Sequence, residues 1–138
     1  MSTTPTTSTQ ALCLYLSQLS HPSRYDVFAA IAQGSRVRNA TDGIGGALLF
    51  DGHRFCQLVQ GPADKVQALM QRIGADVRHR DLLILAQHQS AGALAVAAWA
   101  SGYCDVDALD GFEGPLGLRD EAAVAAFQAL LGKADLIR

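Results

Sequence analysis

Hydrophobic residues recur along the chain in two patterns, as short uninterrupted runs and as stripes with helical spacing. Short apolar runs that end in turn residues are typical of buried strands. The sequence therefore predicts strands at 12–17, 44–50, 54–60, 81–87 and 94–101, with a turn at 88–92 before the last one. Asp51-Gly52 is the strongest hairpin signal, because glycine accepts the positive φ of a tight turn. Segments 44–50 and 54–60 should therefore pair antiparallel.

Three apolar stripes with a spacing of three and four residues predict helices. The first helix begins near His21-Pro22-Ser23 and ends at Gly34, so the polar segment 35–43 is expected to be a loop. The second follows Pro62, which a first helical turn tolerates, and the third spans 119–131. The stripes consist of Tyr25, Val27, Phe28 and Ile31 in the first helix, Val66, Leu69, Met70, Ile73 and Val77 in the second, and Val124, Phe127, Leu130 and Leu131 in the third.

The order of these elements predicts an α+β fold of the ferredoxin-like type, β-α-β-β-α-β followed by one more strand. We expect a mixed sheet with the first two helices on one face and the third helix as a C-terminal cap on the other. The alternative is that the third helix docks on a partner or on a second copy of the chain. The expected organisation is a disordered lead at 1–10, a folded domain at 11–103 and the helical cap at 104–138.

Composition and charge narrow the class of protein. The 138 residues are 49% hydrophobic and 17% charged, which fits one compact domain. A net charge of −2 with scattered Lys and Arg residues argues against nucleic acid as the main partner. The longest apolar stretch, 91–100, is about half of the roughly 20 residues that a membrane-spanning helix needs. Since no secretory signal is present either, we expect a cytoplasmic protein.

Familiar catalytic and metal-binding motifs are missing from the sequence, so we predict neither an enzyme nor a metal site. Cys13, Cys56 and Cys104 share no C-x-x-C spacing and are expected to be free thiols, buried or half-buried. The four histidines lie far apart, without carboxylates at the spacing of a local metal site. Any chemistry would then depend on a cofactor.

Three polar residues lie where an ordinary core would be apolar. Tyr15 is in the first predicted strand, Gln57 is in the third, and Asn39 precedes the second. Each needs a partner, because a buried polar group without a hydrogen bond costs about 1–3 kcal/mol. The first and third strands of a ferredoxin-like sheet are neighbours, so Tyr15 and Gln57 are expected on one face beneath the helices. From the residues alone, a plain hydrogen bond that pins the strand register is the simpler explanation of this pair.

Several short motifs occur in a fixed order between residues 12 and 99. They are Leu-Tyr-Leu-Ser at 14–17, Ser-Arg-Val-Arg-Asn-Ala at 35–40, Gly-Ile-Gly-Gly-Ala-Leu-Leu-Phe-Asp-Gly at 43–52, Arg-Phe-Cys-Gln-Leu-Val-Gln-Gly at 54–61, Ile-Gly-Ala-Asp-Val-Arg-His at 73–79, and Trp99. Together these motifs resemble the BLUF domains, which sense blue light with FAD, and the chain resembles their short stand-alone type. FMN or riboflavin is expected to substitute for FAD.

The resemblance implies roles for individual residues. Tyr15 falls on the photoactive tyrosine of the family and Gln57 on its switching glutamine. In such domains light moves an electron and then a proton from the tyrosine to the flavin, and the glutamine is left rotated or tautomerised. The remaining assignments are Asn39 at the polar edge of the flavin, Arg78 and His79 near the ribityl chain and phosphates, Ile31, Ile44, Val66 and Ile73 as walls, and Trp99 in the last strand.

The sequence also departs from the family pattern. Ser101 stands where the family has a methionine that is implicated in passing the signal to the sheet, and we expect it to hydrogen-bond Gln57 and change the lifetime of the lit state. Other departures are Gly45 for the usual threonine, Val59-Gln60 for Leu-Glu, and Ala95-Val96 for Arg-Phe.

These features favour a blue-light photoreceptor that signals through a partner protein or an oligomer, with 99–131 as the output element. Segment 104–138 is too short to hold a cyclase or phosphodiesterase domain. One alternative is a BLUF-like interaction module that has lost its flavin. The departures from the family pattern favour this alternative. A second is a small hydrolase of the acylphosphatase kind, which the lack of a glycine-rich phosphate cradle beside a suitable arginine disfavours.

Overall fold

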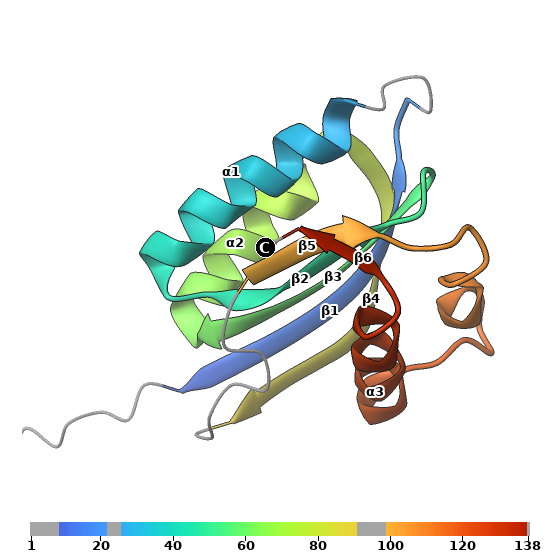
Figure 1. Cartoon of the computed structure of the whole chain (residues 1–138). Helices are drawn as coiled ribbons and strands as arrows, with labels where there is room; N and C mark the ends of the chain where they lie inside the picture. Colours follow the sequence, from blue (N-terminus) through green and yellow to red (C-terminus); the bar gives the residue numbers. More distant parts are fainter. Residues whose placement is uncertain (1–8, 22–25, 91–98, 138) are drawn as a thin grey trace, which may run out of the picture.

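The computed structural model describes residues 9–21, 26–90 and 99–137 (Figure 1). Its elements, in chain order, are β1 (Gln10–Leu19), α1 (Asp26–Asp42), β2 (Gly45–Phe50), β3 (Arg54–Pro62), α2 (Ala63–Ala75), β4 (His79–Ser90), β5 (Trp99–Tyr103), the 3-10 helix η1 (Asp110–Phe112), α3 (Asp120–Leu131) and β6 (Asp135–Ile137). None of the described helices is long and apolar enough to cross a membrane.

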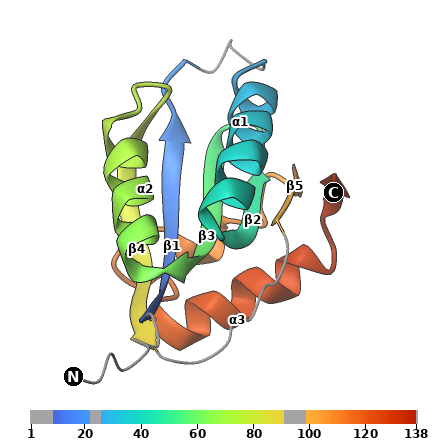
Figure 2. The same cartoon turned by 90° about the vertical axis from the view of Figure 1, so that its left-hand side faces the viewer.

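The strands form one six-stranded sheet in the order β4-β1-β3-β2-β5-β6. Strand β1 pairs antiparallel with both β3 and β4, whereas β2 pairs parallel with β5, so the sheet is mixed. Helices α1 and α2 lie side by side on one face, and α3 crosses the other (Figures 1 and 2). The predicted α+β ferredoxin-like fold with a C-terminal helical cap is therefore confirmed.

The predicted hairpin is present between β2 and β3, which pair antiparallel from Gly45 opposite Gln60 to Phe50 opposite Phe55. In the turn, Asp51 Oδ1 accepts hydrogen bonds from the backbone N–H groups of His53 (2.8 Å) and Arg54 (2.6 Å). Gly52 has a φ of 98°, which a residue with a side chain rarely adopts. The hairpin brings Gln57 to the centre of the sheet.

Helix α1 contradicts the prediction that the first helix ends at Gly34 and that 35–43 is a loop. The helix continues to Asp42. A glycine inside a helix costs only about 1 kcal/mol relative to alanine, and burial of the inner face of the following turns outweighs this cost. Ser35 and Asn39 lie on that face and are 9% and 0% exposed. Of the predicted start, Pro22 and Ser23 lie outside the described residues.

Other boundaries also differ from the prediction. Helix α2 ends at Ala75, and Val77 is 83% exposed, so it does not belong to the apolar stripe. Strand β4 runs to Ser90, so the predicted turn at 88–92 begins inside a strand. Residues 91–98, which include most of the predicted last strand, lie outside the described residues. Strand β6 was not predicted, because three residues are too few for a recognisable pattern.

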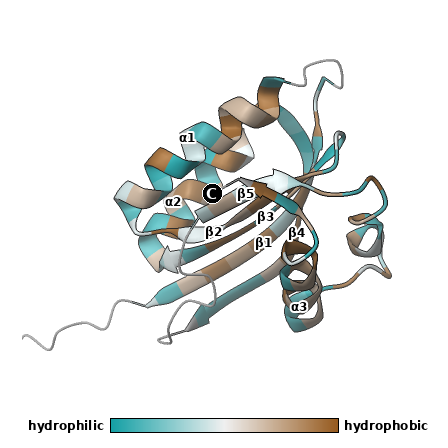
Figure 3. Cartoon of the chain, viewed as in Figure 1, coloured by the Kyte–Doolittle hydropathy of each residue, from teal (hydrophilic) through white to brown (hydrophobic). Residues whose placement is uncertain are grey.

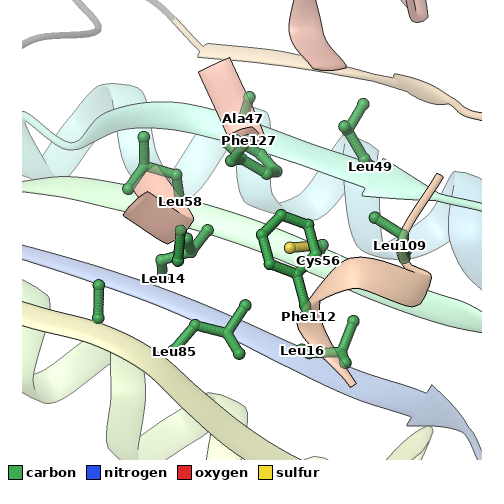
Figure 4. Packing of buried hydrophobic residues seen from close by; sticks show 12 residues of the cluster. Leu14, Leu16, Ala47, Leu49, Cys56, Leu58, Leu85, Leu109, Phe112 and Phe127 are labelled. Carbon is green, nitrogen blue, oxygen red and sulfur yellow. The ribbon is translucent and has the colours of Figure 1, made fainter. Parts of the chain in front are cut away.

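Both faces of the central strands are covered, which explains why β1 and β3 are apolar at successive positions. In Figure 3 these strands are brown, whereas α1 mixes hydrophilic and hydrophobic positions. On the face opposite α1 and α2, Leu109, Phe112 and Phe127 of the C-terminal segment are 0–1% exposed. They point at strand residues (Figure 4), and this cluster includes Leu14, Leu16, Ala47, Leu49, Cys56 and Leu58. The expected position of the third helix on the helix-free face is confirmed.

Arg54 links the C-terminal segment to the start of β3. Its guanidinium contacts Asp51 Oδ2 (2.9 Å), Asp110 Oδ1 (2.7 Å), the carbonyl of Val106 (2.8 Å) and Glu113 Oε1 (3.3 Å). The Arg54 side chain is only 12% exposed and that of Asp51 only 1%. This cation therefore joins the hairpin to the loop that carries η1.

We expect Arg54→Met to lower the free energy of unfolding by about 2 kcal/mol, because the buried carboxylate of Asp51 loses a charged hydrogen-bond partner. Denaturant unfolding measures the effect. Arg80→Met is the matched control, since the pair of Arg80 with Asp81 is 59% and 66% exposed; such a pair contributes less than about 1 kcal/mol. Equal effects of the two substitutions would refute the role given to Arg54.

Candidate functional site

Tyr15 and Gln57 meet on the face of the sheet beneath α1 and α2. The β1–β3 register places them directly opposite each other, as the sequence predicted. The Tyr15 hydroxyl donates a hydrogen bond to Gln57 Oε1, and the two residues are 3% and 2% exposed. The amide therefore uses its acceptor end on Tyr15.

The protonation of Tyr15 follows from its surroundings. Burial raises the pKa of the Tyr15 hydroxyl well above its usual range, and the neighbouring thiols of Cys56 and Cys13 raise it less. The phenol is thus neutral at physiological pH and remains a hydrogen-bond donor. A donor held in a region of low dielectric responds strongly to any charge that develops beside it.

His79 is held by two elements. Its Nδ1 lies 2.7 Å from the hydroxyl of Ser17 on β1, and its Nε2 lies 2.5 Å from the carbonyl of Ile73 on α2. A carbonyl can only accept, so Nε2 carries the hydrogen of that bond. The ring meets that of Tyr15 edge-on at 6.1 Å. The contacts with Ser17 and Ile73 fix the orientation of the imidazole beside the Tyr15 ring.

A cleft of about 420 Å³ opens between α1 and α2 above this pair. Its volume lies in the range of sites for small organic ligands. Six of the residues predicted from the sequence line it, namely Tyr15, Gln57, Ile31, Ile73, Arg78 and His79. The described structure thus gathers into one cavity residues that are spread over β1, α1, β3, α2, the α2–β4 turn and β4.

Asn39 lies on α1, one turn beyond Ser35, which lines the cleft. Asn39 is completely buried, yet neither its Oδ1 nor its Nδ2 has a hydrogen-bond partner among the residues that the structure describes. Leaving both ends of a carboxamide unpaired costs about 1–3 kcal/mol for each group. Asn39 is not itself among the residues that line the cleft, but a ligand that offers both a donor and an acceptor would satisfy its carboxamide.

Other predicted residues lie apart from the cleft. Ile44 and Val66 belong to an apolar cluster with Cys13, Val59 and Leu69. Trp99 and Ser101 line a separate cavity of about 260 Å³ beside α1. The indole Nε1 of Trp99 is buried and has no hydrogen-bond partner within 9–21, 26–90 and 99–137.

The expected hydrogen bond between Ser101 and Gln57 is absent from the described structure. Leu48 stands between them, since it pairs with Gln57 on β3 and with Ser101 on β5. Neighbouring strands are about 4.8 Å apart, so about 10 Å separates the two backbones. A serine side chain is too short to cross that distance.

Part of the cleft wall that α1 forms was not predicted from the sequence. Ser35 and Arg38 line the cleft together with Ile31, at the spacing i, i+4 and i+7 of one helix face. That spacing would have identified them, had the helix been extended past Gly34. Arg72 and Asp76 on the α2 side were missed as well.

Arg78 is engaged by a neighbouring carboxylate. Its Nε lies 2.9 Å from Asp76 Oδ1, and its Nη2 lies 2.5 Å from Asp76 Oδ2. These hydrogen bonds lower the pKa of the Asp76 carboxyl, which stays ionised near neutral pH. The charges of the two side chains therefore largely cancel at the edge of the cleft.

Cys13 and Cys56 are buried and Cys104 is half-buried, all as free thiols, as predicted. Burial raises the pKa of the Cys56 thiol well above its usual range, so it is not a reactive thiolate. Within the described residues, no group of His, Cys, Asp or Glu side chains is placed to hold a metal ion.

The ferredoxin-like sheet carries, between its two helices, a cleft with the Tyr–Gln pair at its floor. The size and lining of this cleft suit a small organic molecule. The sequence model of the family BLUF, "Sensors of blue-light using FAD", matches residues 11–100. The chain belongs to this family. It is thus a blue-light sensor domain, and the cofactor of its family is FAD.

Individual relatives agree with this assignment. The photoactivated adenylate cyclase subunit alpha of Euglena gracilis is 39% identical over 70 residues, which are 50% of this chain and 7% of that protein. Among solved structures, the photo-activated state of BlsA is 20% identical with a TM-score of 0.74 and covers 94% of this chain and 99% of its own, which supports the fold. The BlrP1 BLUF structure is 27% identical with a TM-score of 0.58, over 88% of this chain and 75% of that one.

Proposed function

We propose that the chain is a blue-light photoreceptor in which light rearranges the hydrogen bonds of Tyr15 and Gln57, and that the change is passed to a partner protein or a second copy. The observation that carries the proposal is the buried hydrogen bond from Tyr15 to Gln57 at the floor of the cleft. In this proposal 11–103 is the sensor, 104–138 is its cap, and the protein acts in the cytoplasm without catalytic activity of its own.

The polar groups of the site suit a flavin. The pyrimidine side of the isoalloxazine ring carries carbonyl acceptors and an N–H donor, and Asn39 has one unpaired donor and one unpaired acceptor. Gln57 Nε2 supplies a further donor. Ile31 and Ile73 supply apolar surface from the two helices. In our proposal these residues hold the ring, Ile44 supports it from behind, and Arg78 and His79 lie along the ribityl chain.

When bound, the flavin supplies light absorption and redox chemistry, and the protein supplies orientation and hydrogen bonding. Tyr15 holds its proton on the phenol oxygen and directs it at Gln57 Oε1. A carboxamide has a donor end and an acceptor end, so its reversal turns Nε2 toward Tyr15 and Oε1 toward the ligand. A carboxylate or a thioether lacks this asymmetry. The proposed switch is therefore an exchange of donor and acceptor.

The sheet offers a route for the signal. Gln57 is paired with Leu48, and Leu48 with Ser101, so a change at Gln57 is two strand spacings from β5. Strand β5 leads into the segment that carries η1 and α3. We propose that 99–131 is the output element. A free-energy difference of a few kcal/mol would select between two packings of this segment on the sheet.

Reconstitution with FAD tests the proposal. The purified protein should retain FAD and be yellow, and its long-wavelength absorption band should shift to the red under blue light and recover in the dark. A colourless protein that takes up no added FAD would contradict the proposal and favour an interaction module without flavin.

We expect Asn39→Ala to weaken the binding of FAD by about tenfold, since it removes a buried donor and acceptor worth roughly 1–2 kcal/mol. Equilibrium dialysis or quenching of flavin fluorescence measures the affinity. Thr41→Ala is the matched control, because Thr41 is on the same helix and its hydroxyl donates a hydrogen bond to the carbonyl of Val37. Unchanged affinity in Asn39→Ala would remove Asn39 from the binding site.

A further inference from the structure

Arg38 is a cation on the α1 wall of the cleft. It lies two turns of helix from Ile31 and is exposed. Within the described part of the chain, its guanidinium forms neither an ion pair nor a hydrogen bond. It therefore keeps all of its N–H donors for a ligand.

The other cationic side chains of the cleft are engaged. Arg78 makes a bidentate contact with Asp76. Arg72 lies 3.8 Å from Asp42 Oδ2. His79 uses both ring nitrogens, as described above. Since the charges of Arg78 and Asp76 cancel, as do those of Arg72 and Asp42, Arg38 leaves the cleft with a net positive charge.

We infer that Arg38 binds the phosphate of a flavin nucleotide and that this chain consequently prefers phosphorylated flavins to riboflavin. The inference rests on the proposed function. A phosphate monoester carries a charge of about −1.5 to −2 at pH 7, and the planar guanidinium matches phosphate oxygens with two parallel hydrogen bonds. The family resemblance assigned the phosphate region to Arg78, but the structure commits that side chain to Asp76.

FMN and riboflavin provide the test, because they differ only in the phosphate. The protein freed of flavin is titrated with each, and binding is followed by quenching of flavin fluorescence. We expect FMN to bind about tenfold more tightly at low salt, as for one charged hydrogen-bonded contact. Since Arg38 is exposed, the preference should shrink when the ionic strength is raised to about 1 M, where the Debye length is about 3 Å.

Arg38→Gln should reduce the affinity for FMN to that for riboflavin, leave the affinity for riboflavin unchanged, and remove the salt dependence. Arg38→Lys should keep part of the preference, since it keeps the charge but loses the bidentate geometry. Arg36→Gln is the matched control: it removes the same charge from the same helix, but Arg36 lines the separate cavity beside Trp99. It should retain the full preference for FMN.

Two results would overturn the inference while leaving the proposed function intact. They are equal binding of FMN and riboflavin by the parent protein, and an unchanged preference in Arg38→Gln; in the second case, loss of the preference in Arg78→Gln would assign the phosphate to Arg78. Failure of the parent to bind either flavin would instead overturn the proposed function, and the inference with it.

Discussion

The Tyr15→Phe variant is expected to bind FAD and to show no red shift of its absorption band under blue light. The substitution keeps the ring in the core and removes only the hydroxyl that donates to Gln57 Oε1. Without that donor, the light reaction proposed for this site has no proton to move. The amide of Gln57 is therefore not expected to reverse. Difference spectra before and after illumination measure the effect, which should be a complete loss.

Tyr103→Phe is the matched control, because Tyr103 is 48% exposed and contacts the rings of Phe28 and Phe50 outside the cleft. It should show the red shift of the parent. Gln57→Leu should behave like Tyr15→Phe, since it removes the other partner of the same bond. A normal photocycle in Tyr15→Phe would exclude this hydroxyl from the mechanism.

Phe127→Ala is expected to lower the free energy of unfolding by about 3–5 kcal/mol, the usual cost of removing a fully buried phenylalanine. Phe127 is 0% exposed and packs from α3 into the cluster on the helix-free face of the sheet (Figure 4). A loss of this size is a large part of the stability of a small domain. Denaturant unfolding of the protein, with and without FAD, measures it.

Leu116→Ala is the control for this substitution, since Leu116 is 99% exposed in the same C-terminal segment. It should change the unfolding free energy by less than about 0.5 kcal/mol. A small effect of Phe127→Ala would mean that α3 does not contribute to the folded core. The cap would then be free to leave the sheet at little cost.

The Tyr15–Gln57 pair is the part of the site that local pattern predicts best. Both residues interrupt apolar strands, and the order of the elements makes those strands neighbours, so the pairing follows from topology. The α1 wall is different. Gly34 is a strong local stop signal, and nothing in the adjacent sequence shows that Ser35 and Asn39 are buried on the inner face of a continuing helix.

Ser101 shows the same limit at longer range. Its identity suggests a hydrogen bond with a buried amide, and only the strand order reveals that Leu48 lies between it and Gln57. The engagement of Arg78 by Asp76 likewise depends on side-chain geometry just after α2. Among the described residues, it leaves Arg38 as the unpaired cation of the cleft.

The amino-acid sequence was sufficient to predict the order of the elements apart from η1 and β6, the β2–β3 hairpin, the family and the residue types at the floor of the cleft. These depend on periodicity, on turn chemistry and on motifs within short segments, which act locally. The tertiary structure alone decided where α1 ends, which cations are paired and which residues share the cavity. Those outcomes depend on burial between segments far apart in the chain, and such burial outweighs a local preference of about 1 kcal/mol.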